Sequence, residues 1–334
     1  MSFCIVTFSN DGKYFLVCTN RKQLCLYERK NRNLLWNRTL ARAASKVRFT
    51  PSNDIVVADK AGDVYLHDSN NSNDNGTLLL GHLSMLLDVL VTEDKKYIIT
   101  TDRDEKIRVS VFPNSYNILS YCLGHKKFVT NILELPHDQS VLVSCGGDGV
   151  FLLWDYKIGK ELLRVDFHDK IFKTDIEKFN RQLRECHLEE SVEILPVKHL
   201  RLLALDATSS LVVMSFYNNP LLLVYVINSS AESNYEATYV QSIVTDCEPI
   251  ECNLHNRNLW LLNELGFKVY EFKDNKFVPN DTVNRKLDQL NNLWTSLKKD
   301  TIKQNLFPIL YKRRYDNVQE YFDRKKTRLA STAE

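Results

Sequence analysis

The sequence has no long hydrophobic run and no excess of one charge. Its longest apolar stretch, Leu221–Ile227, is far shorter than the roughly 20 residues that cross a bilayer, so we expect no membrane association. The opening residues MSFCIVTF contain no basic region and no small-residue cleavage site, which predicts no signal peptide. Lys and Arg number 44 against 42 Asp and Glu, a net charge of +2. Any nucleic-acid surface must therefore be local.

Metal-binding cysteine patterns are missing as well. The eight cysteines include no CxxC pair, the spacing typical of zinc sites, so we predict no metal. Several cysteines lie inside apolar strand patterns, as buried free thiols do. We therefore expect a reducing compartment, cytosol or nucleus.

A repeat is present instead. Four windows each contain an apolar strand, a polar turn and a second apolar strand. The residues just before the turns are Phe8, Phe49, Val91 and Leu135, which lie 41, 42 and 44 positions apart. A period of roughly 40–45 residues is typical of the four-stranded blade of a β-propeller.

Short motifs make this prediction more specific. A third strand follows in each window, and the last of these strands ends in the WD dipeptide Trp154-Asp155. Gly81-His82 and Gly124-His125 precede two of the windows. Phe151–Leu153 is apolar throughout, as an inner strand buried on both faces would be. We predict an all-β fold, a WD40 β-propeller.

The repeat weakens after Asp166. Residues 166–190 predict a long loop with a helical turn or two, and two degenerate blades follow at about 191–229 and 236–273, with Tyr239–Val244 in the second. Six blades are thus legible, where seven is the common number. We assign residues 1–280 to the propeller and 281–334 to a helical, basic C-terminal tail. Apolar residues recur at helical spacing in the tail: Leu287, Leu290, Leu293, Trp294 and Leu297.

Five passages resemble one protein family closely. They are Ala58–Tyr65 (ADKAGDVY), Leu80–Asp88 (LGHLSMLLD), Thr101–Ser110 (TDRDEKIRVS), Cys122–Val129 (CLGHKKFV) and Leu310–Leu329 (LYKRRYDNVQEYFDRKKTRL). The family is the WD-repeat, non-catalytic subunit of eukaryotic tRNA (guanine-N7-)-methyltransferase, and the chain is most similar to its animal members. The resemblance covers most of the chain and is dense from about Ala58 to Gly159.

The resemblance implies a function. In the family, a catalytic partner with the S-adenosylmethionine fold methylates N7 of a guanosine in the tRNA variable loop, and the propeller subunit keeps this partner stable and active. We therefore expect a non-catalytic scaffold in a heterodimer with the catalytic subunit, which reaches tRNA through the complex. No catalytic residue and no cofactor is expected in this chain. The family implies the nucleus, with the cytoplasm as a second location.

The resemblance also implies a partner-binding site, because the family's DRDEKIRVS strand faces the catalytic subunit. Glu105 and Arg108 are the strongest candidates, since a carboxylate and a guanidinium at a turn–strand junction can engage opposite charges on a partner. The alternative is an intramolecular pair between these two residues on a solvated face. Weaker candidates are Arg103, Lys106, Lys60 and Asp63.

Neighbouring polar residues are expected to be structural. Asp102 and Asp104 should order their turn through hydrogen bonds to the backbone. His82 and His125 should form hydrogen bonds within their blades, because no carboxylate–histidine set has metal-ligand spacing. Gly146–Gly149 lies between two strands, so we expect a hairpin turn and no nucleotide-binding loop, which needs a following helix.

The tail combines aromatic residues at helical spacing with basic residues. One interpretation is an amphipathic helix that turns Arg313, Arg314, Lys325 and Lys326 towards tRNA phosphates. The other is a docked terminal helix whose charges are simply solvated. Animal members carry a further blade before the passage that resembles Met1–Arg29. Either the sequence is an incomplete gene product or the tail region supplies the missing strands, which leaves closure of the ring open.

A second function is possible in principle for any WD-repeat protein. The alternative is a generic adaptor, such as a substrate receptor of a cullin-type ubiquitin ligase. Such receptors usually carry WDxR after a blade, whereas Trp154-Asp155-Tyr156-Lys157 has lysine in the last position.

Overall fold

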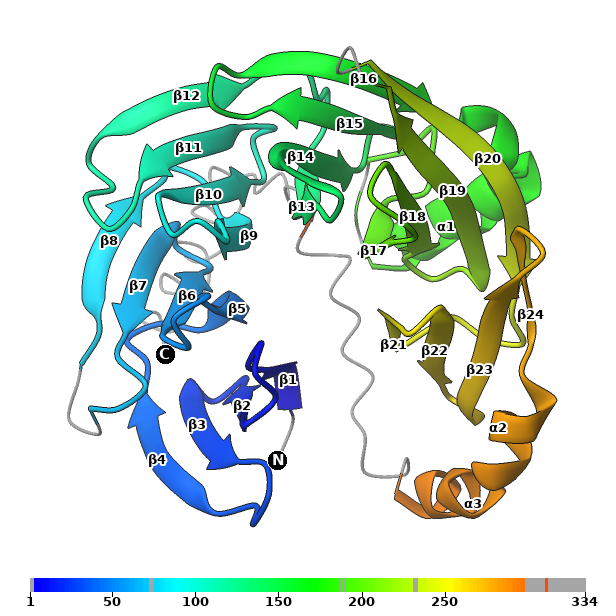
Figure 1. Cartoon of the computed structure of the whole chain (residues 1–334), viewed down its shortest axis with the longest axis horizontal. Coiled ribbons are helices and arrows are strands. Elements are labelled where there is room, and N and C mark those ends of the chain that lie inside the picture. Colours follow the sequence, from blue (N-terminus) through cyan, green and yellow to red (C-terminus); the bar gives the residue numbers. More distant parts are fainter. Residues whose placement is uncertain are drawn as a thin grey trace, which may run out of the picture.

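The computed structural model describes residues 3–71, 75–186, 188, 190–230, 234–297 and 310–311. In these ranges the strands form six four-stranded antiparallel sheets. Within each sheet the strands follow one another in chain order, and the sheets stand as blades around an axis (Figure 1). The WD40 β-propeller predicted from the repeat is confirmed, with the six blades that were legible in the sequence.

Each blade is a meander of four strands. Blades 1 to 3 consist of β1 (Phe3–Phe8), β2 (Tyr14–Thr19), β3 (Gln23–Glu28), β4 (Leu34–Thr39), β5 (Ala44–Phe49), β6 (Ile55–Asp59), β7 (Asp63–His67), β8 (Thr77–Gly81), β9 (Leu86–Val91), β10 (Tyr97–Asp102), β11 (Ile107–Val111) and β12 (Ile118–Cys122). Blades 4 to 6 consist of β13 (Val129–Leu135), β14 (Asp138–Gly146), β15 (Val150–Asp155), β16 (Lys160–Asp166), β17 (Val197–Ala204), β18 (Ser209–Phe216), β19 (Leu221–Ser229), β20 (Tyr235–Val244), β21 (Glu251–His255), β22 (Asn258–Asn263), β23 (Gly266–Lys273) and β24 (Lys276–Pro279). The first strand of each blade lies nearest the axis and contacts the first strand of the next blade (Figure 1).

The structure confirms one strand assignment and corrects another. Phe151–Leu153 belongs to β15, the third strand of blade 4, and is buried on both faces as the sequence indicated. It is apolar throughout because its two faces pack into two different cores, one shared with blade 3 and one with blade 5. Tyr239–Val244 lies in β20, the outer strand of blade 5, and not in blade 6. Blade 5 therefore ends later than the sequence pattern suggested, because β18 and most of β19 are buried on both faces and lack the alternation that delimits strands.

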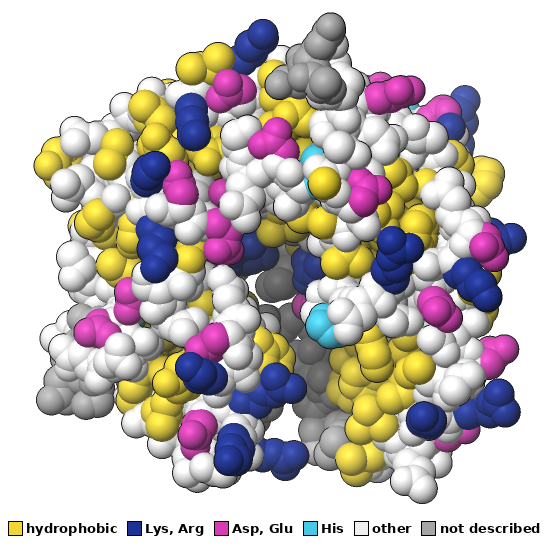
Figure 2. Space-filling view, in the orientation of Figure 1, with side chains coloured by type: hydrophobic (Ala, Val, Ile, Leu, Met, Phe, Trp, Pro, Cys, Tyr) yellow, Lys and Arg dark blue, Asp and Glu magenta, His cyan; other side chains and the backbone are white. Residues whose placement is uncertain are grey.

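The six blades form an arc with a gap between blade 1 and blade 6 (Figure 1). One face of blade 1 packs against blade 2 through residues such as Leu16 and Leu26. The opposite face carries Val6 and Phe8, which are 53% and 57% exposed. Figure 2 shows hydrophobic side chains on both sides of the gap. In the described ranges the ring is therefore open, and its first blade has an apolar face without a neighbouring blade.

Helices accompany the second half of the arc. A short 3-10 helix (His168–Lys170) and α1 (Lys173–Glu185) connect blades 4 and 5, so this connection is more helical than the sequence suggested. Helix α1 packs onto the blades through Phe179 and Leu183, which share a core with strands of blades 4 and 5. The helix thereby covers the ends of two neighbouring blades.

Two further helices, α2 (Asp281–Lys286) and α3 (Asp288–Leu297), follow the last strand. Asn284 forms hydrogen bonds with both backbone groups of Val269, and Asn291 forms them with both backbone groups of Phe267. These amide side chains bind backbone groups in the first part of β23, which does not pair with β24. None of the described helices is long and apolar enough to cross a membrane.

Leu310 and Tyr311 lie buried against blade 4 and α1. The Tyr311 ring meets the edge of Phe128 at a centroid distance of 5.4 Å. The basic tail residues that the sequence singled out, Arg313, Arg314, Lys325 and Lys326, lie outside the described residues.

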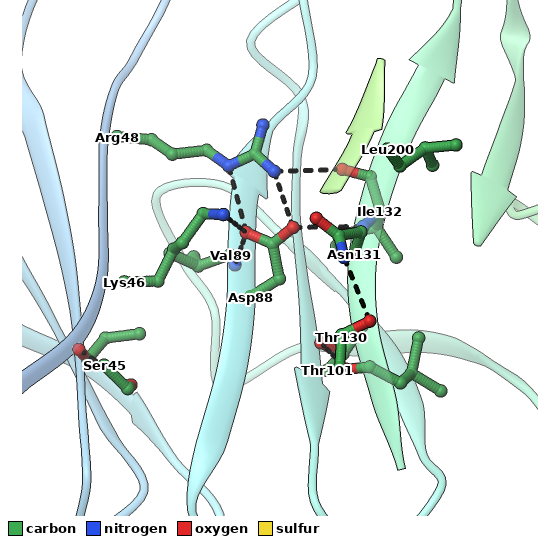
Figure 3. Close-up of polar contacts among 12 residues, drawn as sticks. Ser45, Lys46, Arg48, Asp88, Val89, Thr101, Thr130, Asn131, Ile132 and Leu200 are labelled. Atoms are coloured by element: carbon green, nitrogen blue, oxygen red, sulfur yellow. Dashed lines mark hydrogen bonds and ion pairs between the residues drawn. The ribbon is translucent and has the colours of Figure 1, made fainter. Parts of the chain in front are cut away.

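A buried ion pair joins blades 2, 3 and 4 near the axis (Figure 3). Arg48 of β5 donates from Nε and Nη2 to the two carboxylate oxygens of Asp88 in β9, at 3.0 and 2.5 Å. The same Nη2 donates to the carbonyl of Ile132 in β13, whose own N–H donates to Asp88. Lys46 Nζ lies 3.6 Å from Asp88. One carboxylate thus fixes three successive inner strands.

Threonine hydroxyls continue this connection from blade to blade. Thr101 donates to the carbonyl of Val129 at 2.9 Å, which links blade 3 to blade 4. Thr130 donates to the carbonyl of Val197 at 2.8 Å, which links blade 4 to blade 5. Since Thr101 directly precedes Asp102, the end of β10 is held in place where the candidate site begins.

Candidate partner-binding site

One face of the arc is built from the turns between second and third strands and from the loops that join successive blades. Backbone hydrogen bonds tie these turns and loops together. His82 N donates to Gly62 O at 2.8 Å, and Arg103 N donates to Met85 O at 2.9 Å. The turn 60–62 of blade 2, the loop 82–85 and the turn 103–106 of blade 3 therefore form one continuous surface, which we call the blade 2/3 strip.

The turn of blade 3 is ordered by Asp102. Its Oδ1 accepts hydrogen bonds from the backbone N–H groups of Asp104 and Lys106, at 2.9 and 3.2 Å. Its Oδ2 lies 2.9 Å from Nδ1 of His82, whose Nε2 lies 2.9 Å from the hydroxyl of Thr100. The predicted structural role of Asp102 is confirmed, and the turn and the blade-joining loop form one rigid unit.

Blade 4 has the same arrangement and adds a tryptophan to it. His125 Nδ1 lies 2.9 Å from Asp148 Oδ2, and its Nε2 lies 2.7 Å from the hydroxyl of Ser144. Trp154 of the WD dipeptide donates from Nε1 to the same hydroxyl at 2.8 Å. Both predicted histidines thus form hydrogen bonds within their blades. Gly146–Gly149 joins β14 to β15 as a hairpin turn, as the sequence indicated.

The charged residues of the strip differ in exposure. Lys60, Glu105 and Lys106 are exposed, whereas Arg103 and Asp104 are half-buried. Glu105 has a φ of 73°, a left-handed conformation that costs a residue with a side chain roughly 1–2 kcal/mol. The turn therefore presents its carboxylate at a position where glycine would fit with less strain.

Arg108 lies differently from the exposed charge that the sequence suggested. It is half-buried, and three of its nitrogens donate to groups of the chain itself. Nε donates to the hydroxyl of Ser110 at 2.9 Å, Nη2 to the carbonyl of Ser115 at 2.9 Å, and Nη1 to the carbonyl of Gly81 at 3.3 Å. Among the described ion pairs there is none between Arg108 and Glu105. The arginine thus supports the residue that precedes His82, at the edge of the strip.

Asp63 lies beside the same glycine. It pairs with Gly81 in the register of β7 and β8 and is half-buried. The structure therefore brings all six candidate residues around one loop, Gly81–Met85. Lys60, Glu105 and Lys106 are exposed beside it, Arg103 is half-buried, and Asp63 and Arg108 support it.

Leu83 was not singled out from the sequence. It lies at the centre of the strip, between the turns of blades 2 and 3, and its side chain is fully exposed. The only signal in the sequence is an apolar residue between His82 and Ser84 in a blade-joining loop. Such a residue is indistinguishable from a core residue by composition, since its neighbour Met85 does point inwards.

One group in the described residues has metal-ligating atom types. Atoms of His199, Glu251 and Cys252 lie within 4.8 Å of one another. His199 Nδ1 is 2.9 Å from the hydroxyl of Ser215, and Glu251 accepts a hydrogen bond from Arg201. Burial, together with Arg201, Lys198 and Lys46, holds the pKa of His199 well below its usual range. Surrounding positive charge opposes the binding of a cation here, so we do not assign a metal site.

The fold is that of a WD-repeat β-propeller, and the strip presents the exposed charges of Lys60, Glu105 and Lys106 on one of its faces. A family model described as the tRNA methyltransferase TRM82 WD40 domain matches residues 67–261. The chain is 32% identical over 337 residues to the tRNA (guanine-N(7)-)-methyltransferase non-catalytic subunit wdr4 of Xenopus laevis, across 97% of this chain and 79% of that protein. It is 32% identical over 328 residues to WDR4 of Homo sapiens, across 94% and 74%, and 32% identical over 340 residues to wuho of Drosophila mojavensis, across 98% and 81%.

The chain belongs to this family of non-catalytic subunits of tRNA (guanine-N(7)-)-methyltransferase, and it is not the catalytic subunit. The resemblance found in the sequence is thereby confirmed. Among solved structures, a chain of the mitotic checkpoint complex superposes with a TM-score of 0.64 at 15% identity, over 81% of this chain and 78% of that one. That likeness shows the shared fold alone.

Proposed function

We propose that this protein binds the catalytic subunit of tRNA guanine-N7 methyltransferase through the blade 2/3 strip and keeps that subunit stable and active. The observation that carries the proposal is the rigid presentation of Glu105. Asp102, His82 and Thr100 hold its turn through hydrogen bonds, and the carboxylate stands exposed between Arg103 and Lys106. A charged group on a rigid support loses little entropy on binding and fixes the orientation of a partner.

Arg108 has a positioning role in this proposal. Its hydrogen bond to Gly81 holds the start of the loop 81–85, so the arginine supports the strip from the side. Reversing its charge would remove three hydrogen bonds to the chain and place a carboxylate beside the carbonyl oxygens of Gly81 and Ser115. The strip would then lose its geometry even if the blade core, with Ile107 and Val109 fully buried, stayed intact.

The proposal extends to tRNA and to location. We propose that the assembled heterodimer methylates a guanosine of the tRNA variable loop in the nucleus, with the cytoplasm as a second location. The basic tail, with Arg313, Arg314, Lys325 and Lys326, would contact phosphates. A charge-removal series at these four positions should lower tRNA affinity of the heterodimer and flatten its salt dependence; an unchanged salt dependence would exclude the tail contact.

The experiment that tests the main proposal is co-purification of the chain with the catalytic subunit. Arg108→Glu should abolish the complex and the methylation of tRNA. The matched control is Arg164→Glu, because Arg164 donates to the carbonyl of Gly124 in the next blade, as Arg108 does to Gly81. The control should retain the complex. Full complex formation and activity of Arg108→Glu would contradict the proposal, as would recovery of a ubiquitin-ligase core in place of a methyltransferase.

A further inference from the structure

Leu83 is an unusual residue on this surface. Leu83 is fully exposed, whereas its neighbours Ser84 and Met85 are buried and the side chain of His82 is only 5% exposed. Isolated exposed leucines are common and need no explanation. Here, however, the leucine lies in the middle of the loop 82–85, whose backbone is hydrogen-bonded to the charged turns of blades 2 and 3.

The loop cannot turn Leu83 inwards. Gly62 lies directly beneath it with a φ of 110°, and a Cβ on Gly62 would lie 2.4 Å from His82 O and 2.8 Å from Ser84 O. The backbone of residues 82–84 is therefore pressed against the turn of blade 2. His82 is fixed by Asp102 and Thr100, and Arg103 N holds Met85 O. The exposed position of Leu83 follows from contacts on both of its sides.

The surroundings of Leu83 are charged. Lys60, Lys106 and Glu105 of the neighbouring turns are exposed, whereas Arg103 and Asp104 between them are half-buried charges of opposite sign. An apolar group between two charged turns resembles the usual anatomy of a protein interface, where one buried anchor is surrounded by polar contacts that exclude water. The exposed groups, two lysines and one glutamate, carry a net positive charge, which complements a pocket that is apolar inside and bordered by Asp or Glu side chains.

We propose that Leu83 is the apolar anchor of the blade 2/3 strip and inserts into an apolar, acid-bordered pocket on the methyltransferase's catalytic subunit. The inference rests on the proposed function and adds the residue that supplies affinity, while Glu105 and the lysines supply orientation. Complete burial of one leucine side chain corresponds to roughly 10- to 100-fold in affinity.

The test measures the dissociation constant between the purified chain and the purified catalytic subunit. Leu83→Ala should weaken binding about 10- to 100-fold, and Leu83→Asp should weaken it further, since it would place a carboxylate in an acid-bordered pocket. The control is Ile158→Asp, because Ile158 is an exposed aliphatic residue in the β15–β16 turn, on the opposite face of blade 4. It should bind like the unaltered protein.

The outcomes separate this inference from the proposal on which it rests. If the unaltered chain binds and Arg108→Glu does not, but Leu83→Asp binds normally, Leu83 is not the anchor. The proposal that the blade 2/3 strip binds the catalytic subunit is then retained. If the unaltered chain does not bind, both fail. Thermal unfolding of each variant shows whether a loss of binding comes from a loss of fold; should Leu83→Asp unfold, the affinity of the milder Leu83→Ala decides.

Discussion

Two arginine–carboxylate pairs occupy equivalent places in the arc and differ in one property. Arg48 and Asp88 join the inner strands of blades 2 and 3, and Arg201 and Glu251 join those of blades 5 and 6. The two arginines are similarly shielded. The Asp88 side chain, however, is 0% exposed, whereas the Glu251 side chain is 53% exposed.

This difference in burial changes what each pair does. Asp88 must have every lone pair satisfied, and it accepts from Arg48 and from the backbone of Val89 and Ile132. It therefore ties three blades together at the place where the strip is built. Glu251 keeps contact with water, so its pair with Arg201 contributes little to the stability of the fold. Of these two pairs, the more deeply buried one thus lies in the blades that carry the candidate site.

The largest expected effect is that of Asp88→Ala. The change would leave Arg48 and Lys46 near the axis without their carboxylate, and breaking a buried pair typically costs about 3–5 kcal/mol. Urea unfolding of the purified chain measures the loss. A change below about 1 kcal/mol would show that water or neighbouring groups replace Asp88 easily, and the contrast between the two pairs would fail.

The second prediction concerns acid. Burial raises the pKa of Asp88, but Arg48 and Lys46 outweigh burial and place the pKa below its ordinary value. The folded pKa is thus below the unfolded one, so the stabilisation is complete above about pH 4 and is lost as the pH falls through the folded pKa. The stability difference between the unaltered chain and Asp88→Asn should therefore shrink in acid, as followed by denaturant unfolding from pH 7 to pH 3. A difference that is constant over this range would refute the assignment.

A third prediction, with the opposite sign, concerns the seam between blades 3 and 4. Glu134 accepts a hydrogen bond from Glu93 N at 3.0 Å, and burial, with Glu93 and Asp94 nearby, raises its pKa from 4.5 to about 7. The folded chain binds more protons than the unfolded chain between these values, so its stability falls as the pH rises through them. Glu134→Gln keeps the acceptor and removes the charge. With allowance for solvent screening we expect a gain of about 1 kcal/mol at pH 8 and none at pH 4.

The measurement is thermal or urea unfolding of both proteins at the two pH values. Equal stability at pH 8 would mean that Glu134 is ionised in the fold without cost.

The same contrast explains which parts of the structure were predictable from the sequence. The motifs Gly81-His82, Gly124-His125 and Trp154-Asp155 could be recognised in the sequence because the side chains of His82, His125 and Trp154 have their partners within their own blades. The Arg48–Asp88 pair was not legible, because its partners lie on different blades and no local period relates them. Blade 5 was misplaced because strands buried on both faces have no alternation.

The candidate site was predictable in composition and not in geometry. Glu105 and Lys106 are exposed as expected, but two of the three hydrogen bonds of Arg108 go to Gly81 and Ser115, outside its own strand. Leu83 could not be recognised, since exposure of an apolar residue depends on the packing of Gly62 beneath it. Sequence patterns report on partners within one blade and are silent on contacts between blades.

The smallest expected effect is that of Glu251→Ala. Arg201 would keep its hydrogen bonds to the carbonyls of Cys252 and Leu200, at 2.7 and 2.8 Å, so the arginine would not be left unsatisfied. Exposed pairs contribute about 0–1 kcal/mol, and we expect a loss of about 0.5 kcal/mol in the same urea experiment as for Asp88→Ala. A loss as large as that of Asp88→Ala would mean that burial of the carboxylate does not set the difference between the pairs. Blades 2 and 3, which carry the strip, would then be no more strongly connected than blades 5 and 6.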